Sequence, residues 1–148
     1  VYVGGKYLLG RTLEVTPQGA ELELGLGVEQ GIKVARNTRF EEQSAGLMGR
    51  ALELEHTIEI DVENHTVREV RVEVPERIPV TRDGDDDIEV KVESVEPPWQ
   101  PWEPTGQSLE GGHRWVVPLA ASAKRSLRAT YVVRISGKNE LVGGNRRD

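Results

Sequence analysis

Cysteine is absent from this 148-residue sequence. Its absence excludes disulfide scaffolds, thiolate zinc sites and cysteine nucleophiles, and it leaves the cellular compartment open. There is also no apolar run of about 18 residues or more, so no transmembrane helix is expected. A chain of this length makes one domain whose core can be large enough to fold without cross-links.

Positive charge is in short supply. The 19 Lys and Arg residues are outnumbered by 25 Asp and Glu residues, which gives a net charge of -6. Such a surface repels phosphates, so nucleic acid is not an expected partner. Only the C-terminal end, with Arg146 and Arg147 near Lys138, is locally basic.

Recognisable catalytic motifs are missing as well. The three histidines, His56, His65 and His113, lie far apart and form no zinc-binding pattern. No nucleophile elbow of the G-x-S-x-G type exists, and Ser136-Gly137-Lys138 lacks the rest of a phosphate-binding loop. The sequence therefore predicts a protein without catalytic residues or a cofactor.

The strongest positive signal is an alternation of apolar and polar residues. One parity carries Leu52, Leu54, His56, Ile58, Ile60 and Val62, and the other is acidic or polar. A helix would scatter these residues around its circumference, whereas a strand gathers them on one face. The same period predicts further strands near residues 13–15, 22–26, 32–36, 70–74, 88–92, 115–119 and 127–135.

Turn residues suggest how these strands connect. Gly4-Gly5 predicts a tight hairpin in which Tyr2 faces Tyr7. Hairpins are also expected for 13–15 with 22–24, for 52–62 with 70–74 through an odd-numbered loop near 65–67, and for 115–119 with 127–135. Residues 41–49 and 97–112 are expected to be loops. Pro75 and Pro79 should end the 70–74 ladder, and the parity change at Val95 predicts a β-bulge.

Together these features predict an all-β protein. The expected fold is a two-layer antiparallel β-sandwich of eight to ten strands, immunoglobulin-like in general architecture. It should occupy residues 1–136, with a polar C-terminal tail at 137–148. The chain starts in mid-pattern without Met, as a fragment of a longer protein would.

Five segments resemble, in order and spacing, the C-terminal domain of mucoidy inhibitor A-like proteins, catalogued as domain of unknown function 4139. They are Gly10–Thr12 with Glu21–Val28 and Gly31–Val34, Ser44–Gly49, Ile60–Asn64, Val70–Val72, and Ile78–Thr81 with Asp86–Val90. The resemblance spans roughly residues 1–136 and implies a β-rich domain that follows a coiled coil. It implies no agreed enzymatic activity.

Trp99 and Trp102 are the most interesting candidates for binding. They lie in a Pro-rich loop, where two stiffened indole rings could form a platform for a partner or a sugar. The alternative is that one or both fold back and cap an open end of the sandwich. Trp115 alternates with strand residues and is expected in the core, and His56 in the core or at its rim.

Two further candidates are polar. Asp85, Asp86 and Asp87 could offer oxygen ligands to Ca²⁺, but the spacing of a calcium loop is missing, so a solvated acidic turn is the alternative. Asn64-His65-Thr66 fits a glycosylation acceptor formally, and its place in a turn favours a backbone role for Asn64.

These observations leave two functional hypotheses. The first is a non-enzymatic protein-interaction or scaffold module that binds through the Trp99/Trp102 loop, through an exposed sheet edge or against its own N-terminal coiled coil. The second is a carbohydrate-recognition module that uses the Trp pair. Oligomerisation is compatible with either hypothesis, and a carboxylate-based hydrolase is the weakest alternative.

Overall fold

The computed structural model describes residues 2–3, 5–10, 12–13, 15–20, 22, 24–45, 51–81, 84, 87–104 and 107–136. The described residues form strands, turns and irregular segments, with no helix that could cross a membrane. The chain divides into two compact units, Val1–Gln30 and Gly31–Asp148. The expected acidic turn is only partly within the described residues, and the expected tail at 137–148 lies outside them.

The first unit contains one small hairpin. Strands β1 (Tyr2–Val3) and β2 (Lys6–Tyr7) pair antiparallel with Tyr2 opposite Tyr7, as the sequence predicts. Gly5 has a φ of 77°, the left-handed conformation that glycine adopts without a steric penalty.

The hairpin expected at residues 13–24 is wrong for the residues that the structure describes. A turn does form, because the N–H of Ala20 donates to the carbonyl of Pro17 at 3.1 Å, but the described flanking residues form no strand. Leu13 and Leu22 are about half exposed. Alternation alone does not stabilise a two-stranded hairpin that lacks a surface to pack on.

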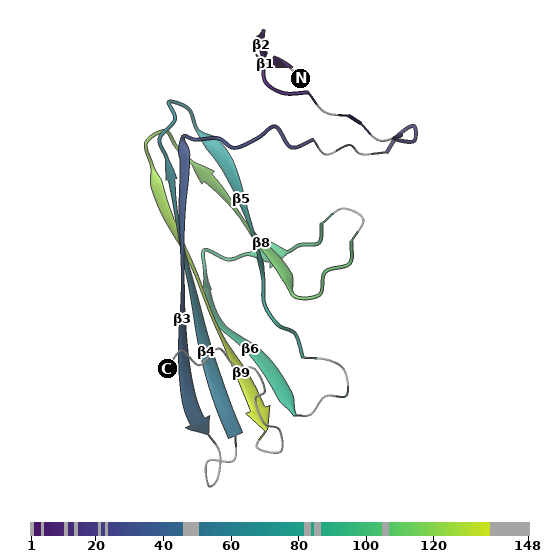
Figure 1. Cartoon of the computed structure of the whole chain (residues 1–148). Helices are drawn as coiled ribbons and strands as arrows, with labels where there is room; N and C mark the ends of the chain where they lie inside the picture. Colours follow the sequence, from purple (N-terminus) through teal and green to yellow (C-terminus); the bar gives the residue numbers. More distant parts are fainter. Residues whose placement is uncertain are drawn as a thin grey trace, which may run out of the picture. The chain divides into compact units, whose positions relative to one another are not determined.

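The second unit holds two antiparallel sheets (Figure 1). The four-stranded sheet has the order β3-β4-β9-β6, and the three-stranded sheet has the order β5-β8-β7. The strand bounds are β3 Ile32–Ala45, β4 Ala51–Asn64, β5 Val70–Arg77, β6 Ile88–Glu96, β7 Gln100–Pro101, β8 Gly112–Leu119 and β9 Lys124–Ser136. The all-β class and the two antiparallel layers are as predicted, and β1 to β9 fall within the expected eight to ten strands.

The core lies between the two sheets. Strand β4 contributes Ile58, Ile60 and Val62, strand β9 contributes Leu127 and Ala129, and all five are almost fully buried. They face the buried side of β8, which carries Trp115, Val117 and Leu119. The alternation that the sequence shows at 52–62 therefore does mark a face hidden from water, and Trp115 is in the core as expected.

Two expected hairpins are wrong. Strand β4 pairs with β3 and β9, whereas β5 pairs with β8, so the chain crosses from one sheet to the other between Asn64 and Val70. Strands β8 and β9 also belong to different sheets and do not pair. Alternation shows which face of a strand is apolar. It does not show whether the next strand pairs beside it in a hairpin or crosses to the other sheet, because the same apolar face is buried in both cases.

Two strands are longer than expected. Residues 41–45, expected in a loop, continue β3, because the whole strand pairs in regular register with β4 up to Ala45 opposite Ala51. Residues 41–44 are exposed, so backbone pairing maintains the strand there without a buried side-chain face. The rest of that expected loop lies outside the described residues. Strand β5 runs through Pro75 to Arg77, since β5 is a sheet edge, where a residue without an N–H is tolerated.

Two local features follow the sequence closely. The register of β6 against β9 shifts between Val92 and Ser94, which is the bulge that the parity change at Val95 predicts. The segment 97–112 is mostly irregular, apart from two-residue β7. Its end is tightly packed, since a Cβ on Gly112 would clash with the carbonyl oxygen of Trp102.

Candidate functional site

Trp99 folds against the protein. Its ring stacks on His113, with centroids 4.3 Å apart and planes at 13°, and lies 5.0 Å from the ring of Trp115. The indole N–H of Trp115 donates to the carbonyl of Pro97 at 2.7 Å, which fixes the start of the loop on β8. This geometry is the capping arrangement considered as the alternative to an exposed platform.

Trp102 is also half-buried, and its backbone N–H donates to the carbonyl of Gly112 at 3.0 Å. The structure therefore holds the ring of Trp99 on β8 and anchors Trp102 to β8 through its backbone. A ligand would have to compete with His113 for the face of Trp99 that His113 covers. A binding role for Trp99 and Trp102 stays a prediction.

The acidic turn gives no metal site in the described part of the chain. Asp85 and Asp86 lie outside the described residues, and Asp87 accepts a hydrogen bond at 2.7 Å from the hydroxyl of Ser136. The backbone carbonyl of Asp87 also accepts from the N–H of Ser136 at 2.8 Å. Asp87 thus ties the start of β6 to the end of β9. The described residues contain no group of three or more potential metal ligands from His, Asp and Glu.

Asn64 has a structural role. Its side chain is 1 % exposed, and its amide donates to the carbonyls of Arg68, Leu119 and Ala120 at 2.8–3.0 Å. Its carbonyl oxygen accepts from the backbone N–H of Thr66 at 2.9 Å. The backbone role expected for Asn64 is confirmed, because the amide nitrogen that a glycan would need is buried and fully engaged.

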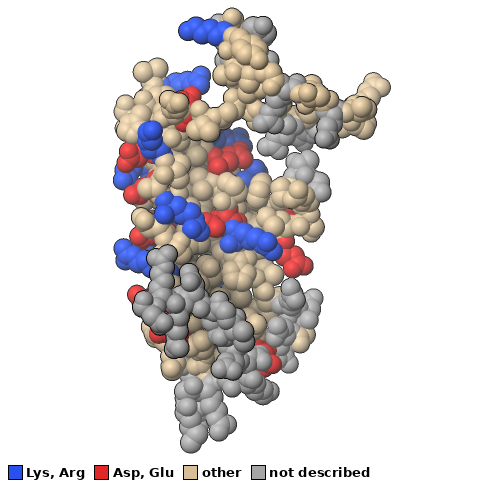
Figure 2. Space-filling model, in the orientation of Figure 1, with Lys and Arg blue, Asp and Glu red and all other residues tan. Residues whose placement is uncertain are grey.

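The outer face of the four-stranded sheet carries alternating charges. Ion pairs cross from β4 to β9 at Glu53–Arg134 (3.7 Å), Glu59–Arg128 (3.8 Å) and Asp61–Lys124 (3.1 Å). The hydroxyl of Ser126 and the ammonium of Lys124 hold the pKa of Asp61 below its ordinary value. Acidic and basic side chains are interspersed over the visible surface in Figure 2. Exposed pairs of this kind add little stability, and they protect the face from non-specific association.

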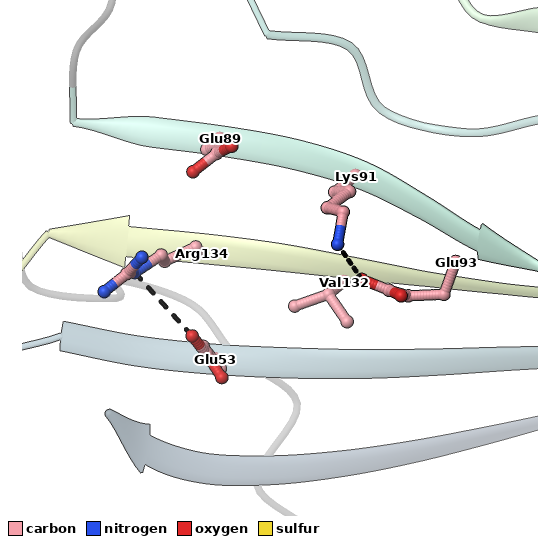
Figure 3. Close-up of a pocket in the computed structure, with 6 residues that line it drawn as sticks. All are labelled: Glu53, Glu89, Lys91, Glu93, Val132 and Arg134. Atoms are coloured by element: carbon pink, nitrogen blue, oxygen red, sulfur yellow. Dashed lines mark hydrogen bonds and ion pairs between the residues drawn. The ribbon is translucent and has the colours of Figure 1, made fainter. Parts of the chain in front are cut away.

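A shallow hollow of about 410 Å³ lies on the same outer face. Figure 3 shows its lining, with Glu89, Lys91 and Glu93 from β6, Val132 and Arg134 from β9, and Glu53 from β4. The carboxylate of Glu93 pairs with Lys91 at 2.8 Å, and that of Glu53 pairs with Arg134. The charged groups of the hollow therefore largely neutralise one another, and no strong attraction for a ligand remains.

The open edge of β3 is the most unusual surface. Strand β3 is an edge of the four-stranded sheet, and no strand in the described part of the chain pairs with its outer side. The N–H of His65 donates to the carbonyl of Gly31, so these two residues form a hydrogen-bonded pair. This pair directly precedes Ile32 opposite Asn64, the first pair of β3 with β4. Since bonded and non-bonded pairs alternate, the even-numbered residues of β3 point their N–H and C=O groups away from β4.

Two large apolar side chains are exposed along this edge. Val34 is 58 % exposed and Phe40 is 52 % exposed, and both lie on the inner face of the sheet. Phe40 begins a row that crosses the sheet through His56 and Tyr131 to Val92. Ring centroids along the row are 5.1 Å apart for Phe40 and His56, and 4.8 Å apart for His56 and Tyr131. The ring of His56 packs against the side of Phe40 that faces β4, and the side of Phe40 at the open edge remains in contact with water.

Burial lowers the pKa of both His56 and His113 below the ordinary value of 6.5. A histidine with a lowered pKa in the folded state binds fewer protons than in the unfolded state. Its contribution to stability is therefore present above pH 6.5 and is lost as the pH falls toward the folded-state pKa. We expect the urea midpoint to fall between pH 7.5 and pH 5.5, and to fall less in a His56→Gln variant. Equal falls in both proteins would show that His56 carries none of the effect.

Sequence reasoning missed Phe40 and Val34 as surface residues. Ile32, Val34 and Phe40 share one parity, but Arg36 and Thr38 interrupt the apolar series. Arg36 points into the gap between the sheets, where it pairs with Glu76 of β5 at 3.1 Å. If Arg36 is accepted as an inward-facing residue of the same parity, the alternation predicts a strand that continues to Phe40.

The comparisons with known proteins concern the family. Neither a search of curated proteins nor a search of solved structures returned a match. The family model for a domain of unknown function, DUF4139, matches residues 4–136. This match begins after β1, includes β2 and both sheets of the second unit, and covers most of the chain. The chain therefore belongs to the DUF4139 family, whose members carry this domain of unknown function.

Proposed function

We propose that this domain is a non-enzymatic interaction or scaffold module that binds a protein partner along the open edge of β3. The observation that carries the proposal is the edge itself, a regular 14-residue strand whose outward backbone groups pair with no other described strand and which carries two exposed apolar side chains. An added strand would satisfy those groups and cover Val34 and Phe40. Open edges of this length are usually blocked, because they invite pairing with other chains.

The opposite edge of the sheet supports the choice of β3. Strand β6 is interrupted by its bulge and carries Glu89, Glu93 and Glu96, so it resists pairing. Strand β3 has no bulge anywhere in its register with β4. Of these two edges, only β3 offers a partner a long and regular template.

The proposal extends to the wider protein. The domain would be the C-terminal part of a larger, coiled-coil-containing protein of the mucoidy inhibitor A-like type, where an interaction module can join chains or partners. The carbohydrate alternative gains no support from the geometry, because the ring of Trp99 already stacks on His113 and packs on Trp115.

A photo-crosslinking amino acid at position 40 of the full-length protein, expressed in its own cell, tests the proposal. We expect a cross-linked species from position 40 and none from position 67, because Val67 is 99 % exposed but lies on the 65–69 crossing and not on β3. Thr38→Pro should remove the cross-link, since residue 38 is even-numbered and its N–H points to the open edge. Equal cross-linking from positions 40 and 67 would contradict the proposal.

Asn37→Pro is the matched control for the fold. The N–H of Asn37 points to β4, so its loss should lower the free energy of unfolding by about 1–3 kcal/mol. Thr38→Pro should cost clearly less, because it removes no backbone hydrogen bond to β4 and breaks only the exposed bond that the Thr38 hydroxyl accepts from Arg36. A Thr38→Pro protein that unfolds as readily as Asn37→Pro would show that the edge assignment is wrong.

A further inference from the structure

The charges along β3 are segregated by sign. Cations occupy the first part of the strand, at Lys33, Arg36 and Arg39, and anions follow at Glu41 and Glu42. An edge strand whose charged side chains all had the same sign would repel a second copy of the strand. When this strand meets a copy of itself in antiparallel order, the cationic part of each strand lies beside the anionic part of the other.

We propose that the partner of this edge is a second copy of this chain, with the two β3 strands paired antiparallel about a two-fold axis through Asn37. The inference rests on the proposed function, since it names the partner of the same edge. The two four-stranded sheets would join into one continuous sheet of 4 + 4 strands. Such an interface is isologous, because each copy presents the same surface.

Geometry restricts the pairings that two β3 strands can make. Even-numbered residues must face even-numbered residues, because only these carry outward N–H and C=O groups. The same rule keeps the two inner faces on one side of the joined sheet. A two-fold axis must therefore pass through a residue of β3, and not between two residues.

Six registers, with axes at residues 36 to 41, pair nine or more residues of each strand, and half of them oppose like charges. An axis at Arg36, Arg39 or Glu41 sets that residue against its own copy. An axis at Thr38 brings neither opposite charges nor the exposed apolar side chains directly together. Two registers remain, centred on Asn37 and on Phe40.

The register centred on Asn37 matches the strand best. It sets Lys33 opposite Glu41 twice and Val34 opposite Phe40 twice. Both exposed apolar side chains of the edge are then covered. The register centred on Phe40 pairs only residues 35–45 and leaves Val34 outside the paired segment. The Asn37 register is therefore the one that we propose.

Cross-linking tests this register directly, because the chain has no cysteine of its own. In the proposed dimer, the two copies of residue 37 form a non-bonded pair with Cα atoms about 4.5 Å apart, which suits a disulfide. We expect Asn37→Cys to give a covalent dimer under mild oxidation. Arg39→Cys is the matched control, since its two copies would lie four residues apart, about 13 Å along the strands.

Sedimentation velocity of the unmodified protein gives a second readout. We expect a dimer at micromolar concentration, and Lys33→Glu should raise its dissociation constant about tenfold by opposing like charges twice. Adding Glu41→Lys should restore dimerisation. Thermal melting of each variant shows whether the fold is intact, because Lys33 also lies opposite Glu63 within the chain.

The outcomes separate this inference from the proposed function. A monomer at all concentrations, or a disulfide at Phe40→Cys and none at Asn37→Cys, overturns the proposed dimer. If position 40 then still cross-links to a different protein in the cell, the interaction module stands and only its partner was misassigned. If position 40 cross-links to nothing, both proposals fail.

Discussion

Asn64→Ala is expected to lower the free energy of unfolding by about 3–5 kcal/mol. Leaving a buried polar group without its partner costs about 1–3 kcal/mol. The variant removes one amide that serves three carbonyls, of which that of Leu119 is buried, and it removes the acceptor for Thr66. These bonds tie β4, the 65–69 crossing and the end of β8 together. Urea denaturation followed by circular dichroism measures the loss.

Two variants make this expectation specific. Thr66→Ala keeps the amide and removes only hydroxyl contacts, so it should cost about 1 kcal/mol. Asn64→Asp keeps the shape but turns a carboxylate toward three carbonyl oxygens, which raises the pKa of that carboxyl group. Its deficit should therefore shrink as the pH falls toward 4, where the group binds a proton. A cost below 1 kcal/mol for Asn64→Ala would show that the crossing does not depend on this side chain.

Trp115→Ala is expected to cost about 3–5 kcal/mol, the usual range for truncating a buried aromatic residue. Trp115 is fully buried among the core residues and supports Trp99. The variant also leaves the carbonyl of Pro97 without the indole N–H. The midpoint of urea unfolding, with the slope held constant, gives the value.

Trp115→Phe and Trp102→Ala serve as its controls. The first keeps a buried ring and should cost less than Trp115→Ala, while still releasing Pro97. The second truncates a half-buried ring outside the core and should also cost less. If Trp102→Ala were as damaging as Trp115→Ala, the loop would be a larger part of the stable structure than its burial indicates.

The sequence predicts where the strands of this fold lie better than it predicts which strands pair with one another. The alternation at 52–62 and the parity change at Val95 depend on which side chains meet water, and both are confirmed. That β9 lies beside β4 depends on long-range packing, since their paired residues are at least 124 − 63 = 61 positions apart. Neighbours in sequence therefore suggested hairpins where the chain crosses between sheets.

The candidate site shows the same division. Trp99 and Trp102 attracted attention as residue types, but their half-buried places follow from contacts with β8 that no local pattern specifies. The sequence predicts an exposed sheet edge in general terms and does not single out β3. Its identity depends on sheet order, which places β3 outermost and so exposes Val34 and Phe40.

The position of β9 between β4 and β6 has a consequence for synthesis on the ribosome. Among the strands that the structure describes, β6 has no sheet neighbour other than β9, so it cannot pair with them until β9 has emerged. From Glu96 to Ser136 is 136 − 96 = 40 residues, which takes roughly 2–8 s at a translation rate of about 5–20 residues per second. For those seconds, the nascent chain exposes the apolar side of β6 and one edge of β4. Newly made molecules would then depend on chaperones more than finished ones.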